Sequence, residues 1–309
     1  MDDQDTEEER SEMIQDFIRA GEIAGKVIRE ARRLIIPGQS YLDIAESIEK
    51  LIVDFGGSPG FPVNISVNEI AAHDTPVYND ERVLGEEGIV KVDFGVHVNG
   101  CVSDNAFTID LSEDHPKLVE ATQEALDEAI NSIRPGKTTG EIGEVIENVI
   151  RDKYGLKPIS NLSGHMILPY ILHAGPTIPN ISRKGGYVIQ EGDVFAIEPF
   201  ATTSEGRGEV KDDLSFVEIF SLEDIRNVRL RRARQIIVNV FQERFTLPFC
   251  KRWLYNRFGY SLVVGMALRE LSVRNLVVGY PRLVEENNQP VGQTERTVIV
   301  EHDSARVLE

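Results

Sequence analysis

The sequence lacks the features of a membrane, secreted or nucleic-acid-binding protein. It has only two cysteines, Cys101 and Cys250, which cannot form a disulfide framework and so favour a reducing compartment. It has no apolar run of the roughly 18 residues needed to cross a bilayer, and its acidic amino-terminal stretch has neither the basic region nor the apolar core of a signal peptide. A net charge of −18 argues against nucleic acid as the main partner. We therefore expect a cytoplasmic protein, monomeric by default, that binds neither membranes nor DNA.

The residues that are present predict a large core and an internal repeat. With 41% hydrophobic residues, the 309-residue chain can bury one large core or two smaller ones. After an acidic tail at 1–10, helical spacing predicts a helix over 11–34, then a break at IIPGQS and a second helix, YLDIAESIEKLIVDFG. The same order returns further on, where a helix over 115–133 ends at IRPGKT and the helix TGEIGEVIENVIRDKYG follows.

The two copies correspond at a constant offset of 98 residues. Pro37 and Gly38 match Pro135 and Gly136, and each second helix begins with a capping-box pattern. Helical hairpins resemble one another in general, but here the proline, the glycine and the cap coincide as well. The pattern therefore indicates an internal duplication.

The segments after each helical pair predict the rest of the fold. β-like residues at 63–109 and 158–200 imply an α+β protein of two helix–helix–sheet halves, related by a pseudo-twofold axis, with a site at their seam. The stretch 221–291 is helical and rich in arginine, and we interpret it as an inserted helical subdomain. The β-like TVIVEHD then returns to a core made of 11–220 and 292–309.

The segment KVDFGVHVNGCVSDNAFTID carries two aspartates, Asp93 and Asp104, within strand-like sequence. Asn99-Gly100 is a strong signal for a two-residue hairpin turn, and centring the hairpin there pairs residue 93 with 106 and residue 95 with 104. Both aspartates then lie on one face as diagonal neighbours, with Cβ atoms roughly 7 Å apart. They would repel unless they share a proton or a cation; the alternative is an exposed strand with two solvated aspartates.

Five more polar residues border segments that look buried. Glu198 ends the apolar run of GDVFAIEPF and Glu295 precedes TVIV, and each alone would more often be a residue at the rim of a strand. His165 and His173 lie in SGHMILPYILHAG and His73 lies in NEIAAHDTP, and each alone would more often be a hydrogen-bonded core histidine. Together, four carboxylates and one histidine form a donor set for divalent Mn, Fe, Co or Zn. So many carboxylates favour two metal ions, an arrangement that serves hydrolysis in aminopeptidases.

Five motifs give the chain a resemblance to type II methionine aminopeptidases, which belong to the pita-bread metallopeptidases. The motifs are FPVNISVNEIAAHDTP, VKVDFGVHVNGCVSDNAFT, GHMILPYILHAG, AIEPFAT and GQTERT, and they follow the family's order from residue 61 to 297. The stretch 221–291 resembles the insertion that separates type II from type I, and the short amino terminus resembles that of the archaeal form. The resemblance implies a pita-bread fold and removal of the initiator methionine from nascent polypeptides, with preference for a small second residue.

The resemblance also implies a role for each metal-site candidate. Asp93 would bind one metal ion and Asp104 would bridge both. His165 and Glu198 would bind the second ion, and Glu295 would be the other bridge. Glu198 would also accept the proton of the attacking water.

The same resemblance also covers residues that do not bind metal. His73 and His173 match the two active-site histidines that do not bind metal, and Phe61 and Leu172 match positions that line the substrate pocket. Arg296 stands where the family usually has histidine. On a strand it should point away from the side of Glu295, so the ligand assignment is kept.

Two other functions stay open. An Xaa-Pro aminopeptidase or dipeptidase of the same fold would share the five ligands, although the AAHDTP context of His73 and the position of the insertion favour methionine removal. A non-catalytic pita-bread protein that binds RNA or ribosomes would typically lack ligands that are all present here. The arginines at 226–234 indicate either contact with the ribosome or, as we favour, a solvated helix face that neutralises local acidic residues.

Overall fold

A computed structural model describes residues 3–309. Its helices are α1 (Asp3–Ala31), α2 (Tyr41–Asp54), α3 (Pro116–Ser132), α4 (Thr139–Glu147), α5 (Arg231–Arg244), α6 (Lys251–Phe258) and α7 (Leu262–Val273), with a 3₁₀ turn η1 (Arg32–Leu34) and a π-helical turn η2 (Asn148–Lys153). Its strands are β1 (Ser58–Pro59), β2 (Asn64–Val67), β3 (Ile70–Ala72), β4 (Ile89–Val98), β5 (Cys101–Asp110), β6 (Lys157–Pro158), β7 (Ser163–Met166), β8 (Thr177–Pro179), β9 (Val194–Ile197), β10 (Phe200–Thr202), β11 (Val210–Leu222), β12 (Phe249–Cys250), β13 (Val277–Glu285), β14 (Val291–Gln293), β15 (Arg296–Val300) and β16 (Ala305–Val307).

The amino-terminal helix is longer than the sequence pattern predicted. α1 begins at Asp3, so the described part of the expected tail at 1–10 is helical, while residues 1–2 lie outside the described range. Glutamates are good helix formers, and acidic groups are favourable near a helix amino terminus. No helix between residues 3 and 309 combines the length and the apolarity that a membrane crossing requires.

The two helical pairs have the same local geometry in both halves. The glycine after the first helix of each pair has a positive φ, 78° at Gly38 and 90° at Gly136, which only glycine adopts without strain. Each donates its backbone N–H to a loop carbonyl, that of Leu84 at 2.8 Å and that of Ile189 at 2.9 Å. The residue two positions on, serine in one half and threonine in the other, caps the second helix through its hydroxyl oxygen. The predicted repeat is therefore present in the backbone itself.

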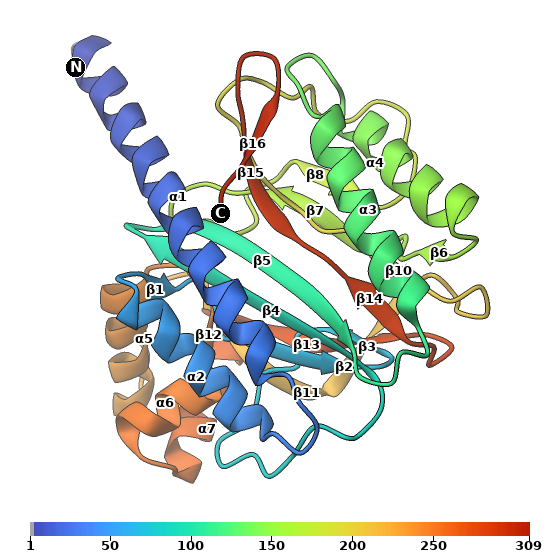
Figure 1. Ribbon diagram of the computed structural model, residues 1–309. Coiled ribbons are helices and arrows are strands. Elements are labelled where there is room, and N and C mark those ends of the chain that lie inside the picture. The colour runs from blue at the N-terminus through green and yellow to red at the C-terminus, as the bar shows by residue number, and fades with distance from the viewer. Residues whose placement is uncertain (1–2) are drawn as a thin grey trace.

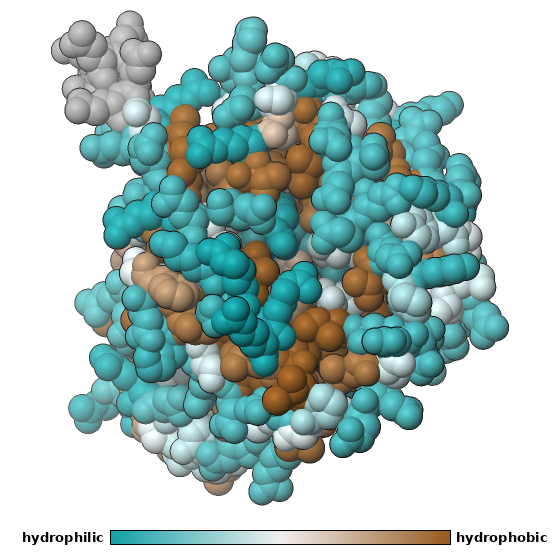
Figure 2. All heavy atoms as spheres, viewed as in Figure 1, coloured by the Kyte–Doolittle hydropathy of each residue, from teal (hydrophilic) through white to brown (hydrophobic). Residues whose placement is uncertain are grey.

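Two sheets form the layers under these helices (Figure 1). One has the strand order β1-β4-β2 with β5 on β4, and the other has the order β16-β15-β9-β7-β8. Helices α1 and α2 bury their apolar faces on the first sheet, while α3 and α4 bury theirs on the second. Viewed from the helix side, the surface is mainly hydrophilic, with separate apolar areas between the helices (Figure 2). The predicted α+β architecture of two helix–helix–sheet halves is confirmed.

The stretch 221–291 is only partly helical, which corrects the expectation of a helical subdomain with these limits. Its helices, α5 to α7, surround an apolar core of their own, but residues 277–285 form strand β13, which pairs with β11 and with β3. Strand formation there depends on partners far away in the sequence, and strand propensity is strongly context-dependent. Helices α5 to α7 therefore lie in the connection between β11 and β13, and these two strands form a sheet with β3 of the main body.

Candidate active site

The β4–β5 hairpin places both aspartates as the sequence predicted. Asn99 and Gly100 have φ values of 49° and 87°, as a type I′ turn requires. The register pairs Gly95 with Asp104 and Asp93 with Ala106. The two carboxylates therefore share one face of the hairpin. The predicted register is confirmed. This face is not the open solvent surface of the alternative interpretation, because Asp104 is buried and one carboxylate oxygen of Asp93 is buried as well.

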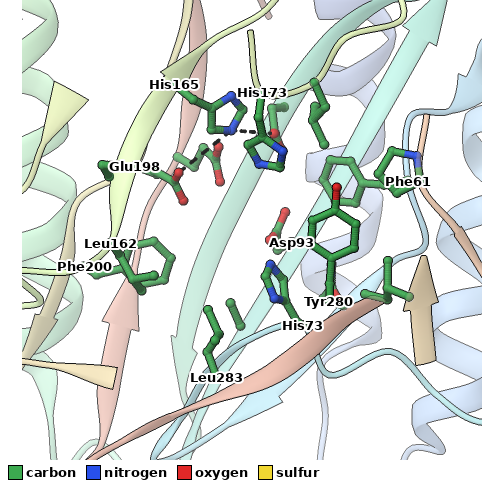
Figure 3. Close-up of a pocket in the computed structure, with 18 of the residues that line it drawn as sticks. Phe61, His73, Asp93, Leu162, His165, His173, Glu198, Phe200, Tyr280 and Leu283 are labelled. Atoms are coloured by element: carbon green, nitrogen blue, oxygen red, sulfur yellow. Dashed lines mark ion pairs between the residues drawn. The ribbon is translucent and has the colours of Figure 1, made fainter. Parts of the chain in front are cut away.

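Both aspartates line a cavity of ≈ 200 Å³ at the seam between the two halves (Figure 3). The nine residues that the sequence singled out all lie along its wall: Phe61, His73, Asp93, Asp104, His165, Leu172, His173, Glu198 and Glu295. Tyr280 and Pro248 also line it, and sequence reasoning missed both. They belong to no recognisable motif, and they reach the cavity only because β13 and the segment before β12 pack against the main body.

The acidic residues and His165 meet at one end of this cavity. One ligand atom each from Asp104, His165 and Glu295 lies within 4.8 Å of the others. His165 Nε2 is 3.6 Å from Asp104 Oδ2 and 3.9 Å from Glu198 Oε1, too far for direct hydrogen bonds. One carboxylate oxygen of Asp93, Asp104 and Glu295 and the Nδ1 of His165 are buried without a hydrogen-bond partner. Each such atom costs free energy unless something binds it.

Burial also changes how these groups titrate. It raises the pKa of Asp93 to about 7. Burial raises the pKa values of Asp104, Glu198 and Glu295 well above their usual range, and repulsion between the carboxylates adds to the effect. Burial, assisted by His173, lowers the pKa of His165 well below its ordinary value. A bound cation would reverse the shift of each carboxylate, and the oxygen-rich donor set with its unpaired atoms fits divalent metal ions.

Thr297 and Arg296 hold the backbone around the acidic cluster. The hydroxyl of Thr297 accepts the backbone N–H of Asp104 at 2.7 Å and donates to the backbone oxygen of Asp104 at 3.1 Å. Arg296 donates to the backbone oxygens of Glu295 at 2.6 Å and Ala106 at 3.2 Å. The guanidinium therefore contacts the peptide of Glu295 and not its carboxylate, and Arg296 is absent from the cavity wall as described.

His73 lies on the cavity wall in an uncommon backbone conformation. Its φ is 63°, a left-handed value that costs a non-glycine residue roughly 1–3 kcal/mol. Its Nδ1 lies 3.0 Å from the backbone oxygen of Pro281; a carbonyl only accepts, so Nδ1 carries the proton and Nε2 is left with a lone pair. Burial lowers the pKa of His73, which keeps the ring neutral. Tyr280 supports it edge-on, at 5.7 Å between ring centroids.

A buried ion network holds the chain just after His73. The side chain of Asp74 is 1% exposed and accepts two hydrogen bonds from Arg82, at 3.0 and 2.9 Å. Arg282 lies 3.7 Å from the same carboxylate, and it directly follows Pro281 on β13. The network therefore ties the end of β3 to the strand whose carbonyl orients the histidine ring.

His173 lies across the cavity from His73 (Figure 3). Its ring centroid is 4.3 Å from that of His165 and 6.3 Å from that of Tyr280. Burial lowers the pKa of His173 to about 4, and His73 adds to the effect. Two neutral imidazoles thus lie on the wall of a cavity whose end is acidic.

Much of the remaining wall is apolar, although Asn64, Asn161 and Ser163 also line it. Phe61 and Leu172 are buried in one cluster, and Phe61 lies directly on Gly95 of β4. A Cβ added at Gly95 would be 2.6 Å from the Phe61 ring, so only glycine leaves room for the ring there. The cavity can therefore receive an apolar side chain next to polar groups that suit peptide chemistry.

Comparison with known proteins agrees with this geometry. Residues 15–225 match metallopeptidase family M24. The methionine aminopeptidase of Pyrococcus horikoshii is 46% identical over 293 residues, which cover 94% of this chain and 97% of that protein. The methionine aminopeptidase of Methanocaldococcus jannaschii is 42% identical over 291 residues, covering 94% and 96%.

Solved structures share the fold at lower sequence identity. A thermophilic Arx1 superimposes with a TM-score of 0.80 at 17% identity, covering 96% of this chain and 90% of that one. The methionine aminopeptidase of Thermotoga maritima gives a TM-score of 0.69 at 22% identity and covers 96% of both chains. The prolidase of Pyrococcus furiosus gives 0.60 at 19% identity, covering 96% and 63%. The expected pita-bread fold is confirmed. With nearly full-length relatives of one kind, the chain belongs to metallopeptidase family M24 and, within it, to the methionine aminopeptidases.

Proposed function

We propose that the protein removes the initiator methionine from nascent polypeptides and prefers substrates with a small second residue. The observation that carries the proposal is the convergence of an acidic cluster, two neutral histidines and an apolar wall on one cavity. The full-length relatives are methionine aminopeptidases, which supports this substrate.

We propose that the acidic end of the cavity holds two divalent metal ions, drawn from Co, Mn, Fe or Zn. Asp93 would bind one ion, His165 and Glu198 would bind the other, and Asp104 and Glu295 would bridge them. The unpaired buried atoms of this group support the assignment. When bound, such ions lower the pKa of water and polarise the scissile carbonyl.

The side chains themselves would move the protons and orient the peptide. Burial and the neighbouring carboxylates raise the pKa of Glu198, which suits a group that accepts the proton of water and passes it to the leaving amine. The lone pair on His73 Nε2 would accept the N–H of the scissile amide. His173, as a neutral imidazole with one N–H, would donate to the substrate carbonyl as negative charge develops on it. Phe61 and Leu172 would contact the methionine side chain.

We further propose that the enzyme is of type II, with residues 223–276 as the insertion. This segment has its own apolar core and lies between the paired ends of β11 and β13, Leu222 and Val277. Two arginines of the cluster are engaged locally: Arg226 pairs with Asp224 at 2.5 Å, and Arg234 donates to the backbone oxygen of Val228 at 2.7 Å. These contacts favour a solvated helix face over a ribosome-binding site. Two unpaired, buried cysteines support a cytoplasmic location.

Peptide cleavage would test the function directly. The protein is stripped with a chelator, reloaded separately with each metal, and given Met-Ala-Ser, Met-Leu-Ser and Ala-Pro peptides. We expect cleavage of Met-Ala-Ser to exceed that of Met-Leu-Ser at least about tenfold, because a closed pocket leaves little room at the next position. Faster cleavage of the Ala-Pro peptide would favour an Xaa-Pro peptidase. No cleavage of any peptide, despite bound metal, would contradict a peptidase of either kind.

A further inference from the structure

The inserted segment is docked on the main body by buried guanidinium groups. The side chain of Arg252 is 2% exposed and binds the carboxylate of Glu49 on α2 at 2.6 and 3.0 Å. The neighbouring Trp253 donates its indole N–H to the same carboxylate at 3.0 Å. This contact lies on α2, and neither Arg252 nor Glu49 is part of the described cavity wall.

A second guanidinium, that of Arg244, makes a different kind of contact. Arg244 is the last residue of α5, and its Nη2 donates to the backbone oxygens of Pro59 and Gly60, both at 2.9 Å. Its Nε donates to the backbone oxygen of Pro248 at 3.0 Å. Burial lowers the pKa of Arg244 to about 10, so the group stays charged at neutral pH. One side chain thus binds three carbonyl groups, two on the main body and one on the insertion.

These carbonyls belong to the cavity wall or adjoin it. Pro248 itself lines the cavity, and Gly60 is followed by Phe61, which lines it too. The main-body side is rigid, because the N–H of Gly60 donates to the oxygen of Gly95 at 2.7 Å and the Phe61 ring lies on that glycine. On the insertion side, Pro248 is followed by β12, whose two residues pair with Ile219 and Phe220 of β11, so the backbone there is anchored to β11 and not to Phe61. Within residues 9–309, the side-chain hydrogen bonds from the insertion to Pro59 and Gly60 come from Arg244. Arg244 therefore links the segment before Phe61 directly to the segment of Pro248.

We propose that Arg244 is a specificity-determining positioning residue, which sets the separation between Phe61 and Pro248 and thereby the width of the slot for the first side chain of the substrate. The inference rests on the proposed function and adds the source of its side-chain selectivity. A slot of fixed width accepts an unbranched methionine and rejects a branched side chain. Without the guanidinium, the carbonyls of Pro59, Gly60 and Pro248 lose their donor. The segment around Pro248 can then shift locally relative to Phe61, while the Arg252 contact and the β11–β12 pairing keep the insertion docked.

The variant Arg244→Met tests this, because methionine keeps an apolar stem and removes every donor. The ratio of kcat/KM for Met-Ala-Ser over Leu-Ala-Ser should fall by about tenfold, the scale on which one misplaced methyl group is discriminated. KM for Met-Ala-Ser should rise several-fold, whereas kcat should change by less than about twofold because the reacting groups are untouched. Arg244→Lys, which keeps one donor group, should recover part of the selectivity. Bound metal per chain should equal that of the unaltered protein.

Two matched variants distinguish an effect of Arg244 on slot width from a general loss of contact between the insertion and the main body. Glu49→Gln weakens the contact with Arg252 and Trp253, so it should lower the melting temperature and leave the Met/Leu ratio unchanged. Arg257→Met removes an exposed arginine of the insertion, 63% accessible. It should change neither the melting temperature nor the Met/Leu ratio. Limited proteolysis within residues 223–276 reports whether the insertion stays docked in each variant; emission from Trp253 would not, because its indole contacts both Arg244 and Glu49 directly.

Three results have distinct meanings. An unchanged Met/Leu ratio in Arg244→Met would overturn the inference, and so would an equal loss of selectivity in Glu49→Gln. Failure of the unaltered, metal-loaded protein to cleave Met-Ala-Ser would instead overturn the proposed function, independently of any variant.

Discussion

Ala106 and Glu295 are joined by a two-way backbone bridge between the two halves of the protein. The N–H of Ala106 donates to the oxygen of Glu295 at 3.3 Å, and the N–H of Glu295 donates to the oxygen of Ala106 at 3.0 Å. Asp104 lies two residues before Ala106, so the bridge fixes two acidic side chains from different halves relative to each other. Arg296 binds both bridge carbonyls and forms an outer ion pair with Glu309 at 3.2 Å.

The first prediction concerns Arg296. Arg296→Met removes the donor to both bridge carbonyls, so the acidic cluster should be less well ordered and metal affinity should fall by about tenfold, as for other residues that support a metal site. Calorimetric titration with Mn²⁺ or Co²⁺ measures this. Glu309→Gln removes only the outer ion pair, with a glutamate that is 54% exposed, and should change little. Unchanged affinity in Arg296→Met would show that the bridge needs no such support.

A second prediction concerns Asp104, which we place between two metal ions. Asp104→Asn should abolish cleavage and leave at most one weakly bound metal ion per chain, as measured by elemental analysis. In the metal-free state the same variant should be more stable than the unaltered protein, because asparagine is always neutral, whereas burial and repulsion by Asp93 force Asp104 to take up a proton that the unfolded chain would release. Full metal content in Asp104→Asn would contradict the bridging role.

Asp93 should make the stability of the metal-free protein depend on pH in an unusual direction. Burial raises the pKa of Asp93 to about 7, from an ordinary value of 3.8, so the folded state binds this proton more tightly than the unfolded state. The contribution to stability is complete below about pH 4 and is lost as the pH rises through about 7. Buried His165 and His173, with lowered pKa values, act in the opposite direction, so the part due to Asp93 is measured against Asp93→Asn. With a chelator present, the unaltered protein should lose more melting temperature between pH 5.5 and pH 8 than that variant does. A smaller difference is expected in Asp104→Asn, and an equal loss in Asp93→Asn would contradict the assignment.

The final prediction concerns His73, which contacts no member of the acidic cluster in our assignment. His73→Asn suits the left-handed backbone, which asparagine tolerates, and it removes the ring whose Nε2 faces the substrate. Both metal ions should stay bound, while kcat should fall by about 10²-fold, the scale of losing one positioned hydrogen-bonding group. Loss of metal in this variant would show that His73 has a different role.

The sequence by itself determined the local geometry of the site. The hairpin register followed from Asn99-Gly100, because a type I′ turn needs positive φ at two positions and side chains alternate with a period of two. The matching turns at Gly38 and Gly136 were readable for the same reason, since each depends on a few adjacent residues. That Asp93 and Asp104 share a face needed nothing beyond this local information.

The tertiary structure decided which distant segments complete the cavity. Strand β13 exists as a strand because β11 and β3 pair with it, and only this pairing brings Tyr280 to the wall and the carbonyl of Pro281 to His73. The contact of Arg244 with Pro59 and Gly60 spans more than 180 positions in the chain. No local pattern encodes such contacts, because their free energy comes from burying partners that meet only when the two halves and the insertion have packed together.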